Sequence, residues 1–240
     1  MKTIELFSGT QSFSKVAREL GHETFCVDSN PKFDNDLTID LKDIIKKCPH
    51  HTQNEKTNSR NNIGNSINWV KLWKRIGEAD IVWMSPPCTT FSMASGNTHW
   101  NDDRSPKTED AKMGRELLKS CWIIAKYCIK EKKIFFIENP RARARWFLPK
   151  EYRKTAWYCQ YGDKRAKPTD IWTNLEWTPK ICHNYIKGQP KHCHHEPAPR
   201  GSKTGTQGLK GSMERGRIPP ALFIEIFKQI KVTKVKEKKK

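Results

Sequence analysis

The sequence predicts an α/β fold: a Rossmann-like, mostly parallel sheet covered by helices, with a small loop-rich insertion. Strand-like and helix-like patterns alternate over residues 1–172, as a parallel sheet requires. Polar residues also follow directly on several apolar, strand-like runs, where sheets of this class place ligand and catalytic groups. A chain of 240 residues is long enough for one domain with a sizeable core.

The first strand, loop and helix form the front of a nucleotide-type site. Residues 3–7 indicate a strand, residues 8–12 a small polar loop, and residues 13–20 a helix with one apolar face. Gly9 in the loop allows close backbone approach to a ligand, and the helix N-terminus favours a negative or polar ligand group.

Two acids follow the next two strand-like runs. Asp28 ends the run 24–27, and Asp40 follows the run 37–39. In this layout an acid after the second strand commonly binds ribose hydroxyls. We therefore expect Asp28 to lie beside a nucleoside ligand.

The candidate nucleophile is Cys88, on a loop stiffened by Pro86 and Pro87. Residues 81–84 form a short apolar strand that runs into this loop. Each proline fixes φ and removes a backbone donor, so the loop is stiff before any substrate arrives. The alternative is a tight turn with an ordinary buried cysteine, because free cysteines are mostly inert core residues.

The candidate acid is Glu138, which follows the apolar run 134–137 directly. A carboxyl at the carboxyl end of a buried strand lies where α/β sheets place their chemistry. Burial there would raise its pKa, which suits a proton donor. An exposed acid that opens a turn is the alternative.

Polar and basic segments flank both candidates. Segment 89–108 is polar, contains two aromatic residues, and predicts a lid beside the thiol. The run 141–146 alternates arginine with alanine and ends on tryptophan. Its arginines either bind phosphates or form a solvated basic face.

In this order, the motifs resemble those of the cytosine-C5 DNA methyltransferase family. They are Phe-x-Gly at 7–9, the acid after the second strand, Pro-Pro-Cys and Glu-Asn. Residues 163–167 look like that family's Gln-x-Arg-x-Arg segment, and residues 217–222 look like its last motif. The resemblance spans almost the whole chain, and such compact versions look like those encoded by bacteriophages and prophages.

The chain departs from the family pattern at a few positions. Gln11 stands where the family has a second glycine, and Pro140 stands where it has valine after Glu-Asn. Asp163 and Lys167 replace the glutamine and the final arginine of the basic segment, and Arg217 precedes the prolines of the last motif. The residues assigned to catalysis are all retained.

The resemblance implies an S-adenosylmethionine-dependent methyltransferase fold and methyl transfer to C5 of cytosine in double-stranded DNA. Cys88 would attack C6 as a thiolate, Glu138 would hydrogen-bond or protonate N3, and Arg165 would hold O2. The base must leave the stack, because this chemistry needs access to the ring face. The implied cofactor contacts are Phe7, Ser8, Gly9, Asp28, Asp40 and Pro86. The implied DNA contacts are Ser92, Arg104, Arg141, Arg143, Lys167 and Arg200.

Other interpretations remain open. The same chemistry on RNA is compatible with the sequence, since phosphate attraction is common to both nucleic acids. A DNA-binding relative that has lost catalysis is favoured by Gln11, Pro140 and Arg217. Amino-methylation of adenine or cytosine is disfavoured, because Cys88 takes the place of the aromatic residue that such enzymes carry after Pro-Pro.

Charge and composition restrict the kind of binding partner and the cellular compartment that we expect for this protein. The formal net charge is +19, and the lysine-rich tail 231–240 accounts for only five of these charges. A basic domain favours a polyanion partner, most simply nucleic acid. The sequence has no run of eighteen apolar residues and no signal peptide, and its eight cysteines suit reduced thiols. We therefore expect a DNA-associated protein of the cytoplasm with no membrane partner. We also expect it to be a monomer.

Segment 175–212 differs in kind, because it has little apolar periodicity and gathers cysteine and histidine. A zinc ion would organise a piece too small to bury a core. Its candidate ligands are Cys182, His183, Cys193 and His195. The spacing fits no standard finger, and surface histidines with incidental thiols are the alternative.

The sequence thus predicts a division into four parts. Residues 1–174 would form the catalytic and cofactor-binding domain, and 175–212 a short target-recognition segment. Residues 213–230 would form a helix that packs back on the catalytic domain, followed by the basic tail 231–240. Since fewer than forty residues are available for recognition, we expect a short or loosely defined target site.

Overall fold

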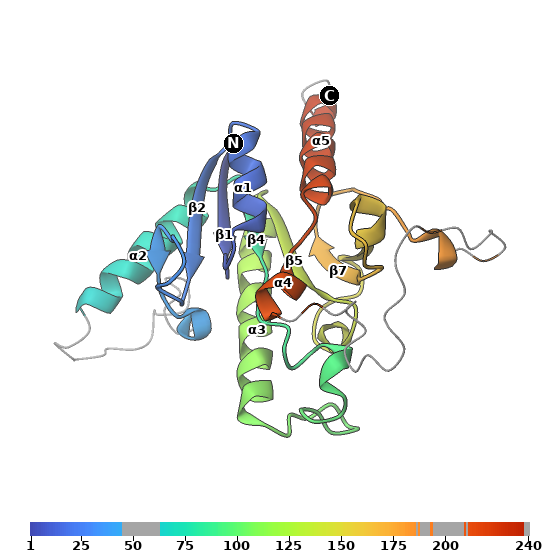
Figure 1. The fold of residues 1–240 in the computed structure, drawn as a ribbon. Helices are drawn as coiled ribbons and strands as arrows, with labels where there is room; N and C mark the ends of the chain where they lie inside the picture. Colours follow the sequence, from blue (N-terminus) through green and yellow to red (C-terminus); the bar gives the residue numbers. More distant parts are fainter. Residues whose placement is uncertain (45–62, 186, 188–192, 194–208, 210, 238–240) are drawn as a thin grey trace.

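The computed structural model describes residues 1–44, 63–185, 187, 193, 209 and 211–237. These residues form a seven-stranded sheet with helices on both faces (Figure 1). Its strands are β1 (Lys2–Leu6), β2 (Glu23–Asp28), β3 (Leu37–Thr38), β4 (Ile81–Met84), β5 (Ile134–Pro140), β6 (Arg153–Trp157) and β7 (Pro168–Thr173). Its α-helices are α1 (Ser12–Glu19), α2 (Ile63–Glu78), α3 (Glu109–Lys130), α4 (Ser212–Gly216) and α5 (Pro220–Glu237).

The strand order is β3-β2-β1-β4-β5-β7-β6. The strands from β3 to β5 pair in parallel, and β7 lies antiparallel between β5 and β6. This is the doubly wound Rossmann order with one antiparallel strand inserted. The predicted Rossmann-like, mostly parallel sheet is therefore confirmed, whereas β6 and β7 were not identified from the sequence.

Both faces of the sheet are buried, and the alternation along β4 shows how. Ile81 and Trp83 pack in the core under α1 and α5, whereas Val82 and Met84 pack in the core under α2 and α3. Successive side chains of a strand point to opposite faces, so an uninterrupted apolar strand is what a two-sided sheet requires. The ring of Trp83 stacks on Phe13 of α1 at 5.2 Å between centroids.

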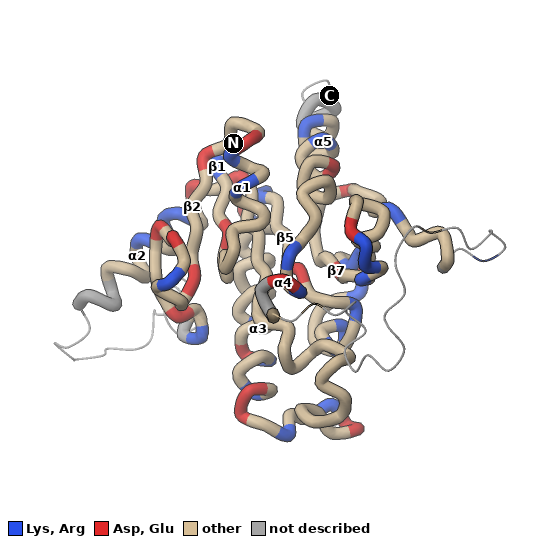
Figure 2. The backbone as a smooth tube through the Cα atoms, viewed as in Figure 1, with Lys and Arg blue, Asp and Glu red and all other residues tan. Residues whose placement is uncertain are grey.

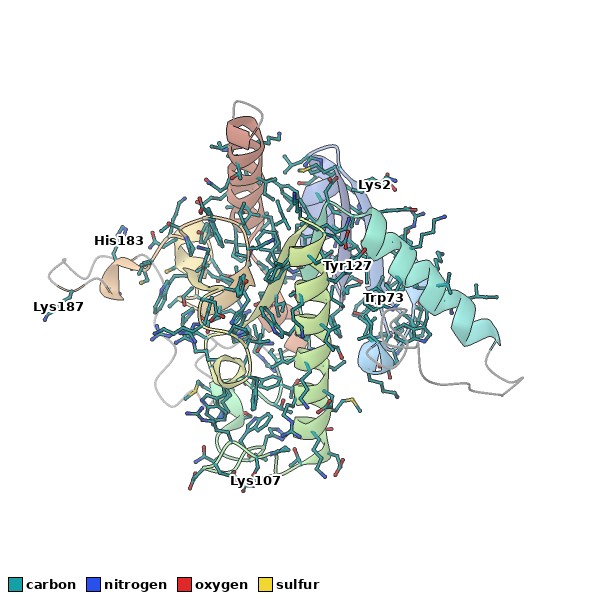
Figure 3. The ribbon with its side chains drawn as sticks, turned by 180° about the vertical axis from the view of Figure 1, so that it is seen from behind. Lys2, Trp73, Lys107, Tyr127, His183 and Lys187 are labelled. Atoms are coloured by element: carbon teal, nitrogen blue, oxygen red, sulfur yellow. The ribbon has the colours of Figure 1, made fainter. Side chains whose placement is uncertain are left out.

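The layer of α2 and α3 is closed by aromatic contacts. Trp73 of α2 meets Tyr127 of α3 edge to face, with 6.2 Å between the ring centroids (Figure 3). Helix α1, which follows β1, covers one face of the sheet, and α3, which follows β4, covers the other. The chain therefore leaves the neighbouring strands β1 and β4 in opposite directions at their carboxyl ends. Open α/β sheets bind their ligands at such a switch point.

Two elements extend further than the sequence indicates. Strand β5 includes Glu138 and Asn139, which pair with Ile171 and Asp170 of β7. Its parallel pairing with β4 ends at Ile137, so the antiparallel partner alone continues the ladder. Helix α5 runs on to Glu237, through most of the predicted tail, because lysine and glutamate are good helix formers.

Two further statements hold for the described residues alone. The polar segment 48–66 of the sequence lies mostly outside the described residues, and α2 begins at Ile63. Among the residues that the structure describes, no helix is long and apolar enough to cross a membrane.

Candidate active site and cofactor edge

The Pro-Pro-Cys loop leaves the sheet at the end of β4 and is held at defined points. The side-chain amide of Asn139 donates to the carbonyl of Pro86 over 3.2 Å, which fastens the loop to β5. The carbonyl of Cys88 accepts the N–H groups of Phe91 and Ser92 at 3.0 and 2.9 Å, so a tight turn follows the thiol. Cys88 itself is half-buried and free. The thiol is thus accessible on a rigid mount.

A glycine in α3 lets this turn approach the helix closely. A Cβ on Gly114 would lie 2.8 Å from the hydroxyl oxygen of Thr90 and 3.2 Å from the ring of Phe91. Neither distance leaves room for a methyl group, because the core there is already packed. Gly114 therefore sets how deeply the segment after Cys88 sits.

Glu138 is buried, with 7% of its surface exposed. Burial raises the pKa of its carboxyl, against the charge of Lys167 and hydrogen bonds from Tyr158 and Ser85 that favour the ionised form. The Tyr158 hydroxyl donates to Oε1 at 3.2 Å. The balance favours a carboxyl that keeps its proton at a higher pH than usual, which is the requirement for a proton donor near neutral pH.

Lys167 is the cation whose charge acts on both candidate groups. Its ammonium lies 4.7 Å from the ring centroid of Tyr158 and donates to the carbonyl of Arg215 at 2.8 Å. Burial raises the pKa of the Cys88 thiol, and the negative charge of Glu138 raises it further, whereas the positive charge of Lys167 lowers it. The pKa of Lys167 is in turn lowered, chiefly by burial.

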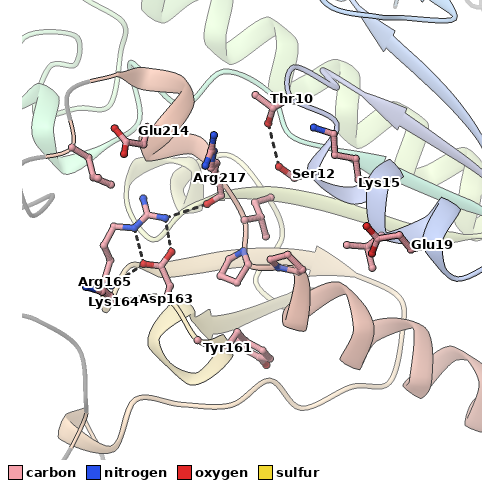
Figure 4. Close-up of a pocket in the computed structure, with 16 residues that line it drawn as sticks. Thr10, Ser12, Lys15, Glu19, Tyr161, Asp163, Lys164, Arg165, Glu214 and Arg217 are labelled. Carbon is pink, nitrogen blue, oxygen red and sulfur yellow. Dashed lines mark hydrogen bonds and ion pairs between the residues drawn. The ribbon is translucent and has the colours of Figure 1, made fainter.

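Arg165 is engaged elsewhere. Its guanidinium holds Asp163 through contacts of 2.8 and 2.5 Å (Figure 4). It also donates to the carbonyl of Arg215 at 3.0 Å. It thereby ties the basic segment 163–167 to the segment before α5. The base contact of Arg165 and the DNA contact of Lys167 stay predictions. In addition, the charge of Lys167 acts on the thiol and the carboxyl, which the sequence did not indicate.

The loop after β1 forms the candidate cofactor edge. The N–H of Gly9 donates to one carboxylate oxygen of Asp28 and the N–H of Asn30 to the other, both at 2.9 Å. Gly9 has a φ of +46°, and an added Cβ would meet nothing within 4 Å. This open, left-handed turn leaves its backbone free for close approach by a ligand. Phe7 precedes it with a φ of +58°.

Gln11, which replaces the family's second glycine, keeps the left-handed conformation with a φ of +56°. Its side chain donates to the carbonyl of Asp34 and accepts from Arg18 at 2.5 Å. These partners hold a non-glycine residue in an uncommon backbone region. The departure is therefore accommodated within the loop.

The remaining cofactor candidates lie at the same edge of the sheet. Ser8 is buried and donates to Oδ1 of Asn35 at 2.9 Å. Asp40 follows β3 and contacts Lys42 at 2.9 Å. Burial pulls the pKa of Asp40 upward, but its hydrogen bonds with Lys42 outweigh this and hold the pKa below its usual value.

A pocket of about 880 Å³ opens beside these groups (Figure 4). It joins the start of α1 to the basic segment and the last motif. Its polar lining includes Thr10, Ser12, Lys15, Arg165, Glu214 and Arg217. Cys88 and Glu138 are not among its lining residues. Its volume is typical of a small-molecule site.

Some of the side chains predicted to contact DNA are exposed, and others are buried and hydrogen-bonded within the protein. Arg104 and Arg141 are exposed, each about 5.7 Å from the ring of a tryptophan. Arg143 is buried and donates to the carbonyl of Ser92 at 2.9 Å and to Oδ1 of Asn97 at 3.2 Å. It thereby holds the predicted lid segment to the turn that follows β5. Lysines and arginines gather around β7 and the loops beside it (Figure 2), and Arg200 lies outside the described residues.

Sequence reasoning missed two groups at this site, Tyr158 and Ser85. Tyr158 begins the 3₁₀ turn η6 (Tyr158–Tyr161) that follows β6 directly. A strand identified over 153–157 would have placed Tyr158 at the edge of the sheet. Ser85 belongs to the Pro-Pro-Cys loop and accepts the indole N–H of Trp83 at 2.8 Å.

Comparisons with known proteins agree with the motifs. No family model matches the chain. A protein of Frog virus 3 (isolate Goorha) named "Probable DNA (cytosine-5)-methyltransferase" is 27% identical over 246 residues, which cover 95% of this chain and 99% of that protein. The similarity runs along almost the whole of both chains and agrees with the resemblance of the motifs to the cytosine-C5 methyltransferase family.

A solved structure of a Spodoptera frugiperda DNMT2 mutant aligns with a TM-score of 0.33 and 18% identity. The alignment covers 75% of this chain and 52% of that chain. A TM-score this low does not establish a common fold, so the fold class rests on the strand order described above.

Proposed function

We propose that this chain transfers a methyl group to C5 of cytosine in DNA through a covalent bond between Cys88 and C6 of the base. The observation that carries the proposal is the shared electrostatic environment of Cys88, Glu138 and Lys167 at the carboxyl ends of β4 and β5. A nucleophile, a proton donor and a cation are the groups that addition to a pyrimidine ring needs.

The first step is addition of the Cys88 thiolate to C6 of a flipped cytosine. The sulfur–carbon bond forms as the C5–C6 π bond opens, and electron density moves through the ring toward N3. Glu138 gives its proton to N3, and Lys167 stabilises the charge that develops on the base. The ring is then an enamine, nucleophilic at C5.

The reaction ends by elimination. Once C5 carries the methyl group, a base removes the C5 proton and the electron pair restores the C5–C6 double bond. The C6–sulfur bond breaks and Cys88 leaves as a thiolate. Glu138 takes back the N3 proton, so the enzyme returns to its starting state.

The residues at the cofactor edge fit S-adenosylmethionine, which when bound supplies an electrophilic methyl group. The open backbone of Gly9 allows close approach, and Asp28 and Asp40 offer acceptors for ribose hydroxyls and an adenine amino group. Pro86, buried beside Cys88, and Phe7 would line the side toward the thiol. The name of the viral relative favours DNA as the substrate.

Transfer of tritiated methyl to unmethylated duplex DNA tests the proposal, with 5-fluorocytosine in the duplex to trap the adduct. Fluorine at C5 blocks the final elimination, so the enzyme should remain bound to the labelled DNA through Cys88. The Cys88→Ala variant should give neither label nor adduct. Label on transfer RNA but not on DNA would assign the activity to RNA. Saturable binding of DNA with no label on either substrate would identify a non-catalytic relative.

A further inference from the structure

Three thiols from separate parts of the chain meet beside β6. Cys159 lies in η6, and Cys182 and Cys193 lie on either side of the 3₁₀ turn η7 (His183–Tyr185). Their sulfur atoms all lie within 4.8 Å of one another. Cys159 and Cys182 are buried and Cys193 is half-buried. Two residues of this cysteine cluster, Cys182 and Cys193, belong to the predicted zinc set. The third, Cys159, comes from the predicted catalytic part of the chain.

His183, the predicted histidine that the structure describes, is not part of the cluster. His183 is exposed, on the segment that projects from the molecule (Figure 3). His195 lies outside the described residues. Two members of the predicted set, Cys182 and Cys193, are thus joined by Cys159, which the sequence did not indicate as a ligand.

Hydrogen-bond donors lie against all three sulfurs. The backbone N–H of Asn184 hydrogen-bonds to the sulfur of Cys182. The side-chain amide of Gln160 donates to the sulfur of Cys193 at 3.6 Å and to that of Cys159 at 3.9 Å. Donors of this kind orient ligating sulfurs and stabilise their negative charge.

The cysteine cluster belongs to a small hydrophobic cluster with few buried apolar side chains. Trp157, Cys159 and Cys182 form its buried part, with Ala166 and Cys193 packed against them, apart from the two main cores of the described residues. Three anionic sulfurs at this separation repel one another, and a divalent cation removes that repulsion.

We propose that Cys159, Cys182 and Cys193 bind a structural zinc ion. Zinc takes thiolate ligands at about 2.3 Å in a tetrahedron, which places the sulfurs about 3.8 Å apart. The observed cluster reaches that arrangement by a small contraction. Each thiol loses its proton on binding, and one further side chain or water completes the four ligands. Thiolates favour zinc over magnesium and calcium.

The ion would fasten the loop-rich segment to the catalytic part of the chain. Cys159 directly follows Tyr158, whose hydroxyl contacts Glu138. Cys182 and Cys193 belong to the segment predicted to recognise the target. A single ion would thus fix the recognition segment relative to the turn that carries Tyr158. This zinc site goes beyond the proposed methyl transfer and does not depend on it.

Metal analysis of the full-length protein tests the proposal. The protein is expressed in cells, purified under reducing conditions without chelator, and analysed by inductively coupled plasma mass spectrometry. About one zinc per chain is expected. In Cys159→Ser and Cys182→Ser the content should fall to below about one tenth of the wild-type value. Cys128→Ser is the matched control, because Cys128 is buried in α3 away from the cluster and its replacement should leave the zinc in place.

A second measurement covers the case in which the serine variants fail to fold. Cobalt offered to the wild-type protein after removal of zinc should give the thiolate-to-metal charge-transfer absorption of a tetrahedral site, and zinc should abolish it. Iron in place of zinc, a disulfide between two of the three cysteines by mass spectrometry, or neither zinc nor cobalt binding would each overturn the proposal.

Discussion

The hydroxyl of Tyr158 donates a hydrogen bond to Oε1 of Glu138 over 3.2 Å, and both side chains are buried. The bond favours the ionised carboxyl, whereas burial favours the protonated one, and burial prevails. The protonation state of Glu138 is therefore set by a balance that single substitutions can move. The pH dependence of methyl transfer reports that balance directly.

Tyr158→Phe should shift the pH profile. Loss of the hydroxyl removes a bond that lowers the pKa of Glu138, so the carboxyl should keep its proton to a higher pH. We expect the alkaline limb of kcat/KM to move upward by roughly 0.5 to 1 in pH, as a hydrogen bond of ordinary strength implies. Tyr161→Phe is the control, since its hydroxyl contacts Lys180 and Glu225 instead. An unchanged profile in Tyr158→Phe would contradict the role of the bond.

Lys167→Met should make the thiol harder to ionise. The positive charge of Lys167 lowers the pKa of Cys88 against burial and the charge of Glu138, so its removal moves the acid limb of kcat/KM to higher pH. The rate near neutral pH should fall about tenfold for every pH unit that the limb moves. Alkylation of Cys88 by iodoacetamide, followed by peptide mass spectrometry over a pH series, measures the same pKa without substrate.

Lys167→Arg provides the matched control for charge. It keeps the cation, so the midpoint of the alkylation profile should stay within about 0.5 in pH of the wild-type midpoint. If methionine and arginine shift the profile equally, the effect comes from packing and the electrostatic role is wrong.

Gly114→Ala should slow the reaction by moving the segment after Cys88. The new methyl group would lie 2.8 Å from the hydroxyl of Thr90, so that segment must shift. We expect a destabilisation of about 1–3 kcal/mol and a fall in kcat larger than any change in KM for the cofactor. Gly77→Ala in α2 is the control, because its Cβ would meet only the hydroxyl of Tyr127 at an ordinary 3.5 Å. Equal loss of kcat in both variants would exclude this explanation.

Glu5→Gln should change how stability depends on pH. Glu5 is buried and accepts the N–H groups of Phe13 and Ser14 at 3.3 and 2.9 Å, at the start of α1. Burial raises its pKa from 4.5 to about 7, although those bonds oppose the shift. The stability that comes from this raised pKa is complete below pH 4.5 and is lost as the pH rises through 7.

Urea unfolding of wild type and Glu5→Gln at about pH 5 and about pH 8 measures this effect. Between these pH values the variant should gain up to about 3 kcal/mol relative to the wild type. The comparison of two proteins at each pH cancels contributions from other titrating groups. A constant difference between them at both pH values would show that Glu5 does not titrate in this range.

The sequence predicts those site residues whose position follows from a local pattern of apolar and polar residues. Cys88 and Glu138 each follow a strand-like apolar run, and neighbouring parallel strands end at the same edge of a sheet, so their proximity can be inferred from the sequence alone. Asp28 and Gly9 are related in the same way across β1 and β2. The motif order indicated the chemistry because it relates these positions along the whole chain.

The groups that the sequence does not predict arrive through β6 and β7. These strands pair antiparallel at the far edge of the sheet, and their register depends on contacts that no local pattern specifies. Tyr158 and Lys167 reach the site from one end of this pair, on the connection between β6 and β7, and Cys159 lies on the same connection. Their roles depend on a pairing that only the folded chain reveals.

The thiol and the carboxyl belong to neighbouring strands, and the amide of Asn139 holds the loop of one to the strand of the other. Their spacing is therefore set largely by the sheet, whose strands lie about 4.8 Å apart. Under the proposed function, the predicted recognition segment can be lengthened, shortened or exchanged while the reacting groups keep that spacing. Which nucleotide sequence is read and what is done to the base could then be engineered as separate properties of one chain.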